Sequence, residues 1–406
     1  MAANIWGLRG NAQMLIASLM LLSVTALGDD RPPSPALPLK LSPSTILITA
    51  ACVRPHVEFL ASPELQGRGP AGKGKARDYL IQHFQQLNLR PLFGDSYLQR
   101  LPSGVRDSDE PQYVGANVGA YLPAADQQGA NEWIILNAHY DHLGNFPGGY
   151  YPGADDNASS IAMLLETARQ LAGQPQPRRN IAFVAFDLEE QLLWGSRWFV
   201  AHPPCELSQI KFCMTADLLG RSLGDLPMRS VFVMGSETAP QLRPTLLGNN
   251  PSGRLDVKFL GGDMVGTRSD YGPFRDQGIP FLFFSTGEHP DYHTPQDTPD
   301  KIDYPKLAEI STLMARLTHE LGCMDQAPSW TPPDEKDIID AVTIRQVTEE
   351  LLRADQQGQI QLSGLQRAFV TQLESKTSYA IRRGHISPEE RSWLVRSAQI
   401  LLISVF

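Results

Sequence analysis

Histidine and carboxylate side chains of the kinds that bind divalent cations recur along this chain of 406 residues. His139 and Asp141 stand in the segment His-Tyr-Asp-His, and Asp155 follows His139 after sixteen positions. Further residues of these types follow downstream: Glu189, Glu190, Asp217 and His293. Metal-assisted hydrolysis uses such ligands around two ions together with a base near a bound water. The spacing therefore predicts a hydrolase site with two cations.

The first half of this predicted site lies at the His-Tyr-Asp-His segment and at residues 153–157. His139 offers an imidazole nitrogen, and Asp141 is placed to accept the other ring N–H and so orient the ring. Asp155 lies in a turn that leads into a helix, and we expect its short carboxylate to bridge the two metals. Asp156 and Asn157 fall where a helix N-cap belongs. His142 receives no role.

The second half consists of residues that each follow an apolar run. Glu189 and Glu190 are adjacent, and side chains on an extended segment alternate in direction. By position, Glu190 is the metal ligand and Glu189 the general base. Asp217 and His293 complete the set as further metal ligands.

Apolar runs alternate with helical patterns between these residues. Strands are predicted at 133–136, 181–186, 212–215, 231–234 and 281–284, and helices at 46–60, 76–87, 160–171 and 304–321. Nearly continuous apolar strands separated by helices indicate an α/β fold with a mostly parallel sheet covered on both faces. Ligands gather at the carboxyl ends of such strands, where the candidate residues fall.

The N-terminal region has the pattern of an export signal. Arg9 precedes an apolar run that ends near residue 27, and the run is too short to cross a membrane. We expect a signal peptide at 1–28, a proline-rich linker at 29–45 and a catalytic domain at 46–325. The expected location is periplasmic or secreted, without a membrane span after cleavage; an uncleaved N-terminal anchor is the alternative.

Composition and the C-terminal region limit other functions. The net charge is −9 and no basic cluster occurs, so nucleic acid is an unexpected partner. Residues 334–406 are predicted to form a small helical appendage that resembles a degenerate EF-hand pair. Its first loop offers Arg353, Asp355, Gln357 and Gly364 at calcium-ligand positions, and these cannot bind calcium. The pairing of Cys52, Cys205, Cys213 and Cys323 stays open.

Taken in order, these motifs resemble the co-catalytic zinc aminopeptidases, the group that contains bacterial leucyl aminopeptidase and glutamate carboxypeptidase. The resemblance covers about residues 46–325 and includes Gly67-Arg68-Gly69. It implies an α/β/α sandwich with a mixed sheet, peptide substrates and two Zn²⁺, although other divalent metals also suit these ligands. His139 and Asp217 would hold one zinc, Glu190 and His293 the other, with Asp155 between them.

Two departures from that family concern the substrate pocket. Leu192 stands where a glycine commonly follows Glu-Glu-Gln, and Tyr271 replaces the histidine of a Ser-Asp-His sequence. Two alternatives are a glutaminyl cyclase with one zinc and an inactive homologue that binds a partner. Residue specificity, the choice among aminopeptidase, carboxypeptidase and dipeptidase, and the oligomeric state stay open.

Overall fold

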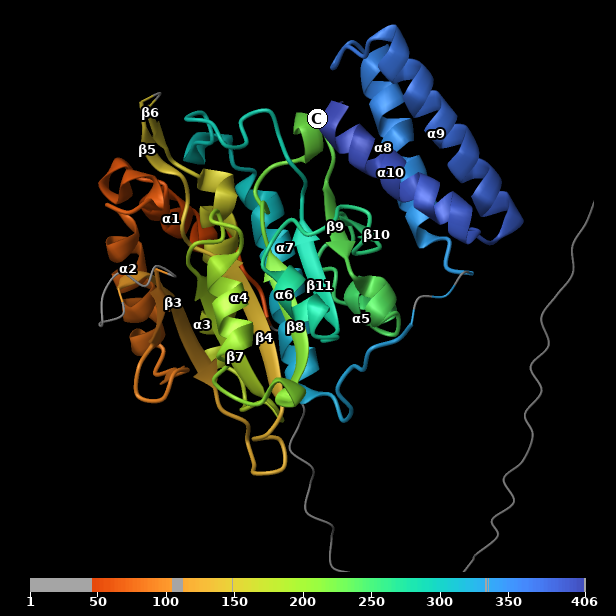
Figure 1. The fold of residues 1–406 in the computed structure, drawn as a ribbon. Helices are drawn as coiled ribbons and strands as arrows, with labels where there is room; N and C mark the ends of the chain where they lie inside the picture. The colour runs from red at the N-terminus through yellow and green to blue at the C-terminus, as the bar shows by residue number, and fades with distance from the viewer. Residues whose placement is uncertain (1–45, 104–111, 148, 333, 335, 405–406) are drawn as a thin grey trace, which may run out of the picture. The chain divides into compact units, whose positions relative to one another are not determined.

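A mixed sheet of nine strands lies between two layers of helices (Figure 1). The computed structural model describes residues 46–103, 112–147, 149–332, 334 and 336–404. The predicted signal peptide at 1–28 and linker at 29–45 lie outside these residues. Among the residues described, no helix is long and apolar enough to cross a membrane.

The strands run in the order β1-β3-β7-β4-β8-β11-β9-β10, and β2 pairs with β3. The four central strands β7, β4, β8 and β11 are mutually parallel, whereas β3 is antiparallel to β7 and β9 to β11. Their bounds are β1 (Arg90–Pro91), β2 (Leu98–Pro102), β3 (Tyr113–Leu122), β4 (Trp133–His139), β7 (Asn180–Phe186), β8 (Ile210–Ala216), β9 (Ser230–Met234), β10 (Asp256–Leu260) and β11 (Phe281–Ser285).

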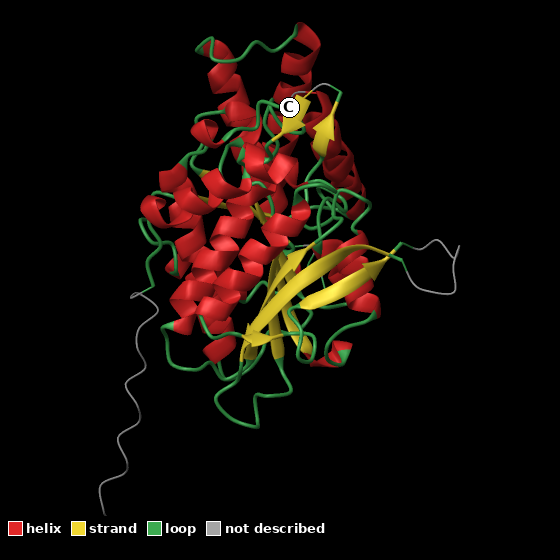
Figure 2. Ribbon diagram, turned by 90° about the vertical axis from the view of Figure 1, so that its left-hand side faces the viewer, coloured by secondary structure: helices red, strands yellow, loops and turns green. Residues whose placement is uncertain are grey.

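Alternating side chains of the central strands enter two different cores. On β7, Ile181 and Phe183 pack on one face, and Ala182 and Val184 pack on the other. The first face is covered by helices α1 (Ala50–Leu60), α2 (Lys73–Gln86), α3 (Ser160–Ala172) and α7 (Tyr304–Cys323), which form the helical layer seen in Figure 2. The second face is covered by α4 (Trp194–Ala201) and α6 (Tyr271–Asp276).

The five predicted strands and four predicted helices are therefore confirmed, with ends shifted by a few residues. The prediction of a mixed sheet in an α/β sandwich is also confirmed, with parallel pairing among the four central strands and antiparallel pairing of β3 and β9 to them. Sequence analysis missed β3, because glycine, alanine and asparagine residues separate its bulky residues, which therefore form no continuous apolar run. Two small elements lie near the site: the hairpin of β5 (Gly144–Phe146) and β6 (Gly149–Tyr151).

Three further helices follow the sandwich, and we call them the C-terminal helices: α8 (Ile339–Gln356), α9 (Gly364–Arg383) and α10 (Pro388–Ser404). Between α8 and α9, Asp355 accepts a hydrogen bond from the Leu362 amide at 2.9 Å and binds the Arg367 guanidinium at 2.6 Å. The Asp355 carboxylate thus stabilises the turn between two helices. The prediction of a helical C-terminal region is confirmed.

Specific contacts fix the C-terminal helices against β10. Thr343 of α8 donates to the Phe259 carbonyl at 2.6 Å, and Arg391 of α10 binds Asp263 at 2.6 Å.

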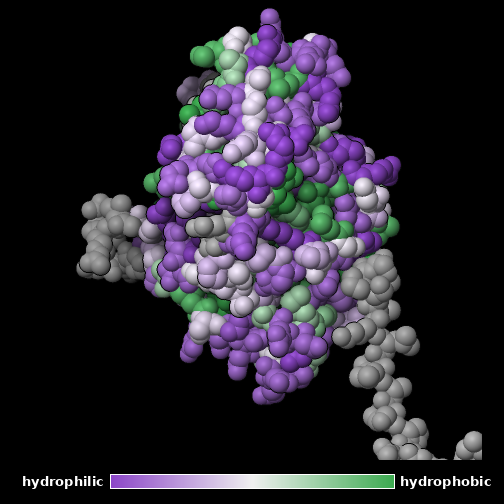
Figure 3. Space-filling model, turned by 90° about the vertical axis from the view of Figure 1, so that its right-hand side faces the viewer, coloured by the Kyte–Doolittle hydropathy of each residue, from purple (hydrophilic) through white to green (hydrophobic). Residues whose placement is uncertain are grey.

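The face drawn in Figure 3 is largely hydrophilic and carries a group of hydrophobic residues near mid-height. Buried leucines of all three helices, including Leu351, Leu373 and Leu394, share the second core with the sheet.

Candidate metal centre

The candidate residues converge at the carboxyl ends of three neighbouring parallel strands. His139 is the last residue of β4, Glu189 and Glu190 follow β7, and Asp217 follows β8. Since β7, β4 and β8 are adjacent and parallel, their carboxyl ends meet at one edge of the sheet. His293 arrives from the loop that follows β11.

One group of donor atoms consists of His139, Asp156 and Asp217. His139 Nε2 lies 3.4 Å from an oxygen of Asp156 and 3.4 Å from an oxygen of Asp217. Each residue offers one atom to a set whose members all lie within 4.8 Å of one another. All three side chains are buried.

A second group consists of His142, Asp156, Glu190 and His293. His293 Nε2 lies 3.0 Å from Asp156 Oδ2 and 3.2 Å from Glu190 Oε2. His142 Nδ1 lies 2.8 Å from the other oxygen of Glu190. Their donor atoms also lie within 4.8 Å of one another. Asp156 thus belongs to both groups, through different oxygens.

The position of Asp156 corrects the expectation that Asp155 lies between the two groups. The Asp155 carboxylate points elsewhere: it accepts the Gly220 amide at 2.5 Å and lies 3.5 Å from His289 Nε2. Asp297 holds this turn, because its carboxylate accepts the amides of both Asp155 and Asp156 at 2.9–3.0 Å. The spacing of two adjacent aspartates contains no signal that distinguishes them.

His142 is a residue to which sequence analysis assigned no role. It is 4% exposed and belongs to the second donor group. Its place in His-Tyr-Asp-His, three residues after His139, was the available signal. The structure therefore offers an imidazole in addition to the predicted set.

Asp141 was expected to orient the His139 ring through its carboxylate, but its contacts are different. Its Oδ1 lies 3.7 Å from His139 Nδ1, which is too long for a hydrogen bond, whereas its main-chain carbonyl lies at 3.2 Å. The carboxylate instead accepts the Glu189 amide at 3.1 Å. Asp141 thus contacts the imidazole through its main chain and fixes the backbone of Glu189 through its side chain.

The two adjacent glutamates have different electrostatic surroundings. Burial raises the pKa of Glu189 well above its usual range; His139 opposes this shift, and Asp270 and Asp217 add to it. For Glu190, burial and Asp156 raise the pKa, but hydrogen bonds from His142 and His293 outweigh them and lower it. Pairs of carboxyl groups whose pKa values are pushed apart are typical of acid–base catalysis.

His293 is held in an unusual backbone conformation. Its φ is +55°, in the left-handed region that residues other than glycine seldom adopt. The ring of Tyr292 stacks on its imidazole, with ring centroids 3.9 Å apart. Burial lowers the pKa of His293, but the carboxylates of Asp156 and Glu190 raise it to about 10. The same carboxylates would favour a bound cation.

The donor set fits divalent metal ions. Imidazole nitrogens and carboxylate oxygens are the ligands of catalytic zinc sites. Asp217 Oδ1 is buried and has no hydrogen-bond partner among the residues described. Several carboxylates also share one buried space, which is costly unless cations compensate their charge. A site for two metal ions needs two groups of donor atoms, and the two groups that share Asp156 fit this need.

Arg68 holds the loops that carry this site together. Its side chain is fully buried, and all of its hydrogen bonds go to main-chain carbonyl groups at 2.8–3.0 Å. Sequence analysis noted Arg68 only as part of a glycine-flanked motif. The carbonyl groups belong to Leu60, Tyr140, Pro152, Gly153 and Asp156.

With this geometry established, comparison with known proteins identifies the domain. Residues 117–318, which contain both donor groups, match the sequence model of peptidase family M28. This part of the chain belongs to peptidase family M28. The chain is 28% identical over 211 residues to aminopeptidase YwaD of Bacillus subtilis. That match covers 48% of this chain and 42% of the relative, so the chain spans less than half of the relative's length.

Solved structures share the fold. The LapA aminopeptidase of Legionella pneumophila has a TM-score of 0.53 and 20% identity, over 69% of this chain and 73% of that chain. The glutaminyl cyclase of Porphyromonas gingivalis has a TM-score of 0.54 and 19% identity, over 68% of this chain and 99% of that chain. At these identities the likeness concerns the fold alone.

The structure shows the surroundings of both departures from the family pattern. Leu192 is 82% exposed and has a φ of +61°, the left-handed region that favours glycine. Tyr271 is buried, and its ring stacks on Phe281 and Phe283 with centroids 5.0 and 4.8 Å apart. Tyr271 therefore packs in the core, whereas Tyr292 lies at the site.

Cys205 and Cys213 are unpaired thiols, so no disulfide closes the short loop between them.

Proposed function

We propose that the protein is an exported, zinc-dependent aminopeptidase that removes N-terminal residues from peptides with two metal ions. The sharing of Asp156 between two donor groups, with Glu189 beside them, carries this proposal. Membership of peptidase family M28 and the aminopeptidase among its relatives support it.

The two donor groups divide the ligands. His139 and Asp217 would hold one zinc, and Glu190 and His293, with His142 as an added donor, would hold the other. Asp156 would bridge both. Bound there, zinc would polarise a peptide carbonyl and lower the pKa of water from about 15.7 towards 7.

Glu189 has the position and electrostatics of the general base. Its Oε2 lies 4.0 Å from His139 Nε2, at the edge of the first donor group. Burial raises its pKa, which suits a carboxyl group that accepts and returns a proton. Glu189 accepts a proton from the attacking water and returns it to the leaving amine. Asp141 keeps it in place through the Glu189 amide.

Metal stoichiometry and substrate blocking test the proposal together. We expect elemental analysis to find two zinc ions per chain, and leucine p-nitroanilide to be hydrolysed until a chelator is added. The N-acetylated anilide should resist cleavage, because an aminopeptidase requires a free amino group. One zinc per chain with cyclisation of N-terminal glutamine would favour the cyclase. Full metal content without hydrolysis of any peptide would favour a binding homologue.

Export is a separate part of the proposal, supported by the apolar run before residue 28. We expect expression of the full chain in a bacterial host to yield a protein that lacks the N-terminal segment and lies outside the cytoplasm. N-terminal sequencing of the fractionated protein checks this; an intact N-terminus in the cytoplasmic fraction would contradict it.

A further inference from the structure

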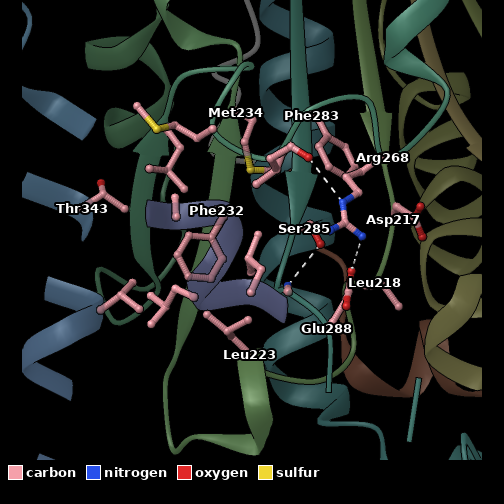
Figure 4. A pocket seen from close by; sticks show the side chains of 18 of the residues that line it. Asp217, Leu218, Leu223, Phe232, Met234, Arg268, Phe283, Ser285, Glu288 and Thr343 are labelled. Atoms are coloured by element: carbon pink, nitrogen blue, oxygen red, sulfur yellow. Dashed lines mark hydrogen bonds and ion pairs between the residues drawn. The ribbon is translucent and has the colours of Figure 1, made fainter. Parts of the chain in front are cut away.

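An apolar cavity of about 120 Å³ adjoins the candidate metal centre. Asp217, a donor of the first group, lines one part of it together with Leu218 and Tyr292. Figure 4 shows Asp217 and Leu218 on one side of this space and Phe232 and Thr343 on the other. The cavity therefore leads from a metal ligand into the apolar region below the C-terminal helices.

The C-terminal helices supply a wall of this cavity. Ile344 and Val347 of α8 and Ala398 and Leu401 of α10 line it. Three of these side chains are at most 6% exposed: Ile344, Val347 and Leu401. The contacts of Thr343 with Phe259 and of Arg391 with Asp263 hold α8 and α10 in place. Where they form this wall, α8 and α10 are thus packed against the rest of the protein.

The charges of the lining favour an uncharged occupant. Arg268 and Glu288 both line the cavity and form an ion pair of 2.9 Å. Each neutralises the other, so neither offers an uncompensated charge to a substrate. Figure 4 shows this pair on the side of Asp217, away from Phe232. Apolar side chains such as Met234 and Met264 line the rest of the cavity.

We infer that this cavity receives the apolar side chain of the N-terminal residue of the peptide, and that the C-terminal helices determine substrate preference. The inference rests on the proposed function and extends it to segments outside residues 117–318, where the family match lies. An apolar side chain that reaches α8 and α10 gains contacts that a small side chain does not make. In an apolar pocket, one methylene group changes the ratio of kcat/KM between two substrates by about 10–200-fold.

Two substitutions on α10 test the inference in the zinc-loaded full chain. Ala398→Phe places a ring in the cavity, and we expect the ratio of kcat/KM for leucine to that for alanine p-nitroanilide to fall about tenfold or more. Leu401→Ala enlarges the cavity and should raise the preference for phenylalanine over leucine. Ala368→Phe, on the exposed side of α9, is the matched control and should leave both ratios unchanged.

Zinc content and the melting temperature of each variant separate a change of preference from a loss of folding. If Ala398→Phe fails to fold, the shift in Leu401→Ala decides. Folded variants with unchanged ratios would overturn the inference while peptide hydrolysis by the wild type continues. A wild-type protein that hydrolyses no anilide would overturn the proposed function, and the assignment of the occupant with it.

Discussion

Two adjacent glutamates at the end of β7 (Asn180–Phe186) acquire different chemistry from their immediate surroundings. Glu190 accepts hydrogen bonds from two histidines, which stabilise its charged form. Glu189 is buried among other carboxylates, which destabilises its charged form. The ligand and the base are therefore distinguished by what surrounds each carboxyl group.

Replacing Glu189 with Gln tests its role as the base. The amide keeps the size of the side chain but cannot accept the proton, so we expect kcat to fall about 10²–10⁴-fold. Zinc content should stay at the wild-type value, because Glu189 belongs to neither donor group. Steady-state kinetics and elemental analysis provide both measurements. Wild-type turnover in this variant would remove Glu189 from the mechanism.

Asp155→Asn and Asp156→Asn form a matched pair. We expect Asp156→Asn to lose zinc, because Asp156 contributes to both donor groups. Asp155→Asn should retain zinc, since its amide oxygen can still accept the Gly220 amide. Elemental analysis after dialysis compares the two. The opposite pattern would restore Asp155 as the bridging residue.

At the scale of elements, buried polar side chains hold loops and helices in register. Arg68 connects the loops around residues 60, 140 and 153 by hydrogen bonds to their carbonyl groups. Glu237, at the turn after β9 (Ser230–Met234), accepts the Gly262 amide at 2.7 Å near the C-terminal helices. Each contact joins segments that are distant in sequence.

Arg68→Lys should weaken metal binding although Arg68 touches no metal. A lysine has three donors in place of five and cannot reach all of these carbonyl groups, so the turn at residues 152–156 loses support. Loss of such supporting contacts typically costs 10–100-fold in metal affinity. Competition with a zinc-binding dye measures this. The exposed Arg90→Lys is the control, and equal affinities in the two variants would contradict the role.

Glu237→Gln should stabilise the protein at alkaline pH. Burial raises the pKa of Glu237 to about 7, so its folded-state pKa lies above its unfolded value. Its contribution to stability is present below the unfolded pKa and is lost as pH rises towards 7. At pH 8 the neutral amide should add about 1–3 kcal/mol to the free energy of unfolding.

Chemical denaturation of this variant at pH 5 and pH 8 measures the difference. The gain should shrink at pH 5, where the wild-type carboxyl group is already protonated in the folded state. Glu64→Gln, at a side chain 59% exposed, is the control and should show no such dependence. A gain that is equal at both pH values would contradict the assignment.

At the scale of the whole molecule, the metal centre couples to folding, because its ligands come from β4, β7, β8 and the loop after β11. Removing zinc with a chelator leaves the carboxylates of both groups without compensating charge. We expect the melting temperature to fall by several degrees, since a ligand at about 1,000 times its Kd stabilises by about 4 kcal/mol. Calorimetry checks this, and Asp156→Asn should show no response to the chelator.

The sequence alone was sufficient to predict the sandwich and most of the site. Apolar runs bounded by polar residues predicted β4, β7, β8, β9 and β11, because buried parallel strands are apolar on both faces. The same pattern placed His139, Glu189, Glu190 and Asp217 at strand ends. β3 was missed because small and polar residues interrupt its bulky ones, so no apolar run marks it, and it is stabilised by pairing with β7.

Tertiary structure alone decided which of two adjacent aspartates faces the metal site. The amides held by Asp297, 142 residues after Asp155 in the chain, orient this turn. The contact of His142 with Glu190 and that of the Asp141 carboxylate with the Glu189 amide were decided in the same way, by partners distant in sequence. The wall that α8 and α10 contribute to the cavity is also invisible in the sequence, because it depends on where distant helices pack. Local patterns determine which elements form, whereas side-chain direction depends on contacts that only the folded chain makes.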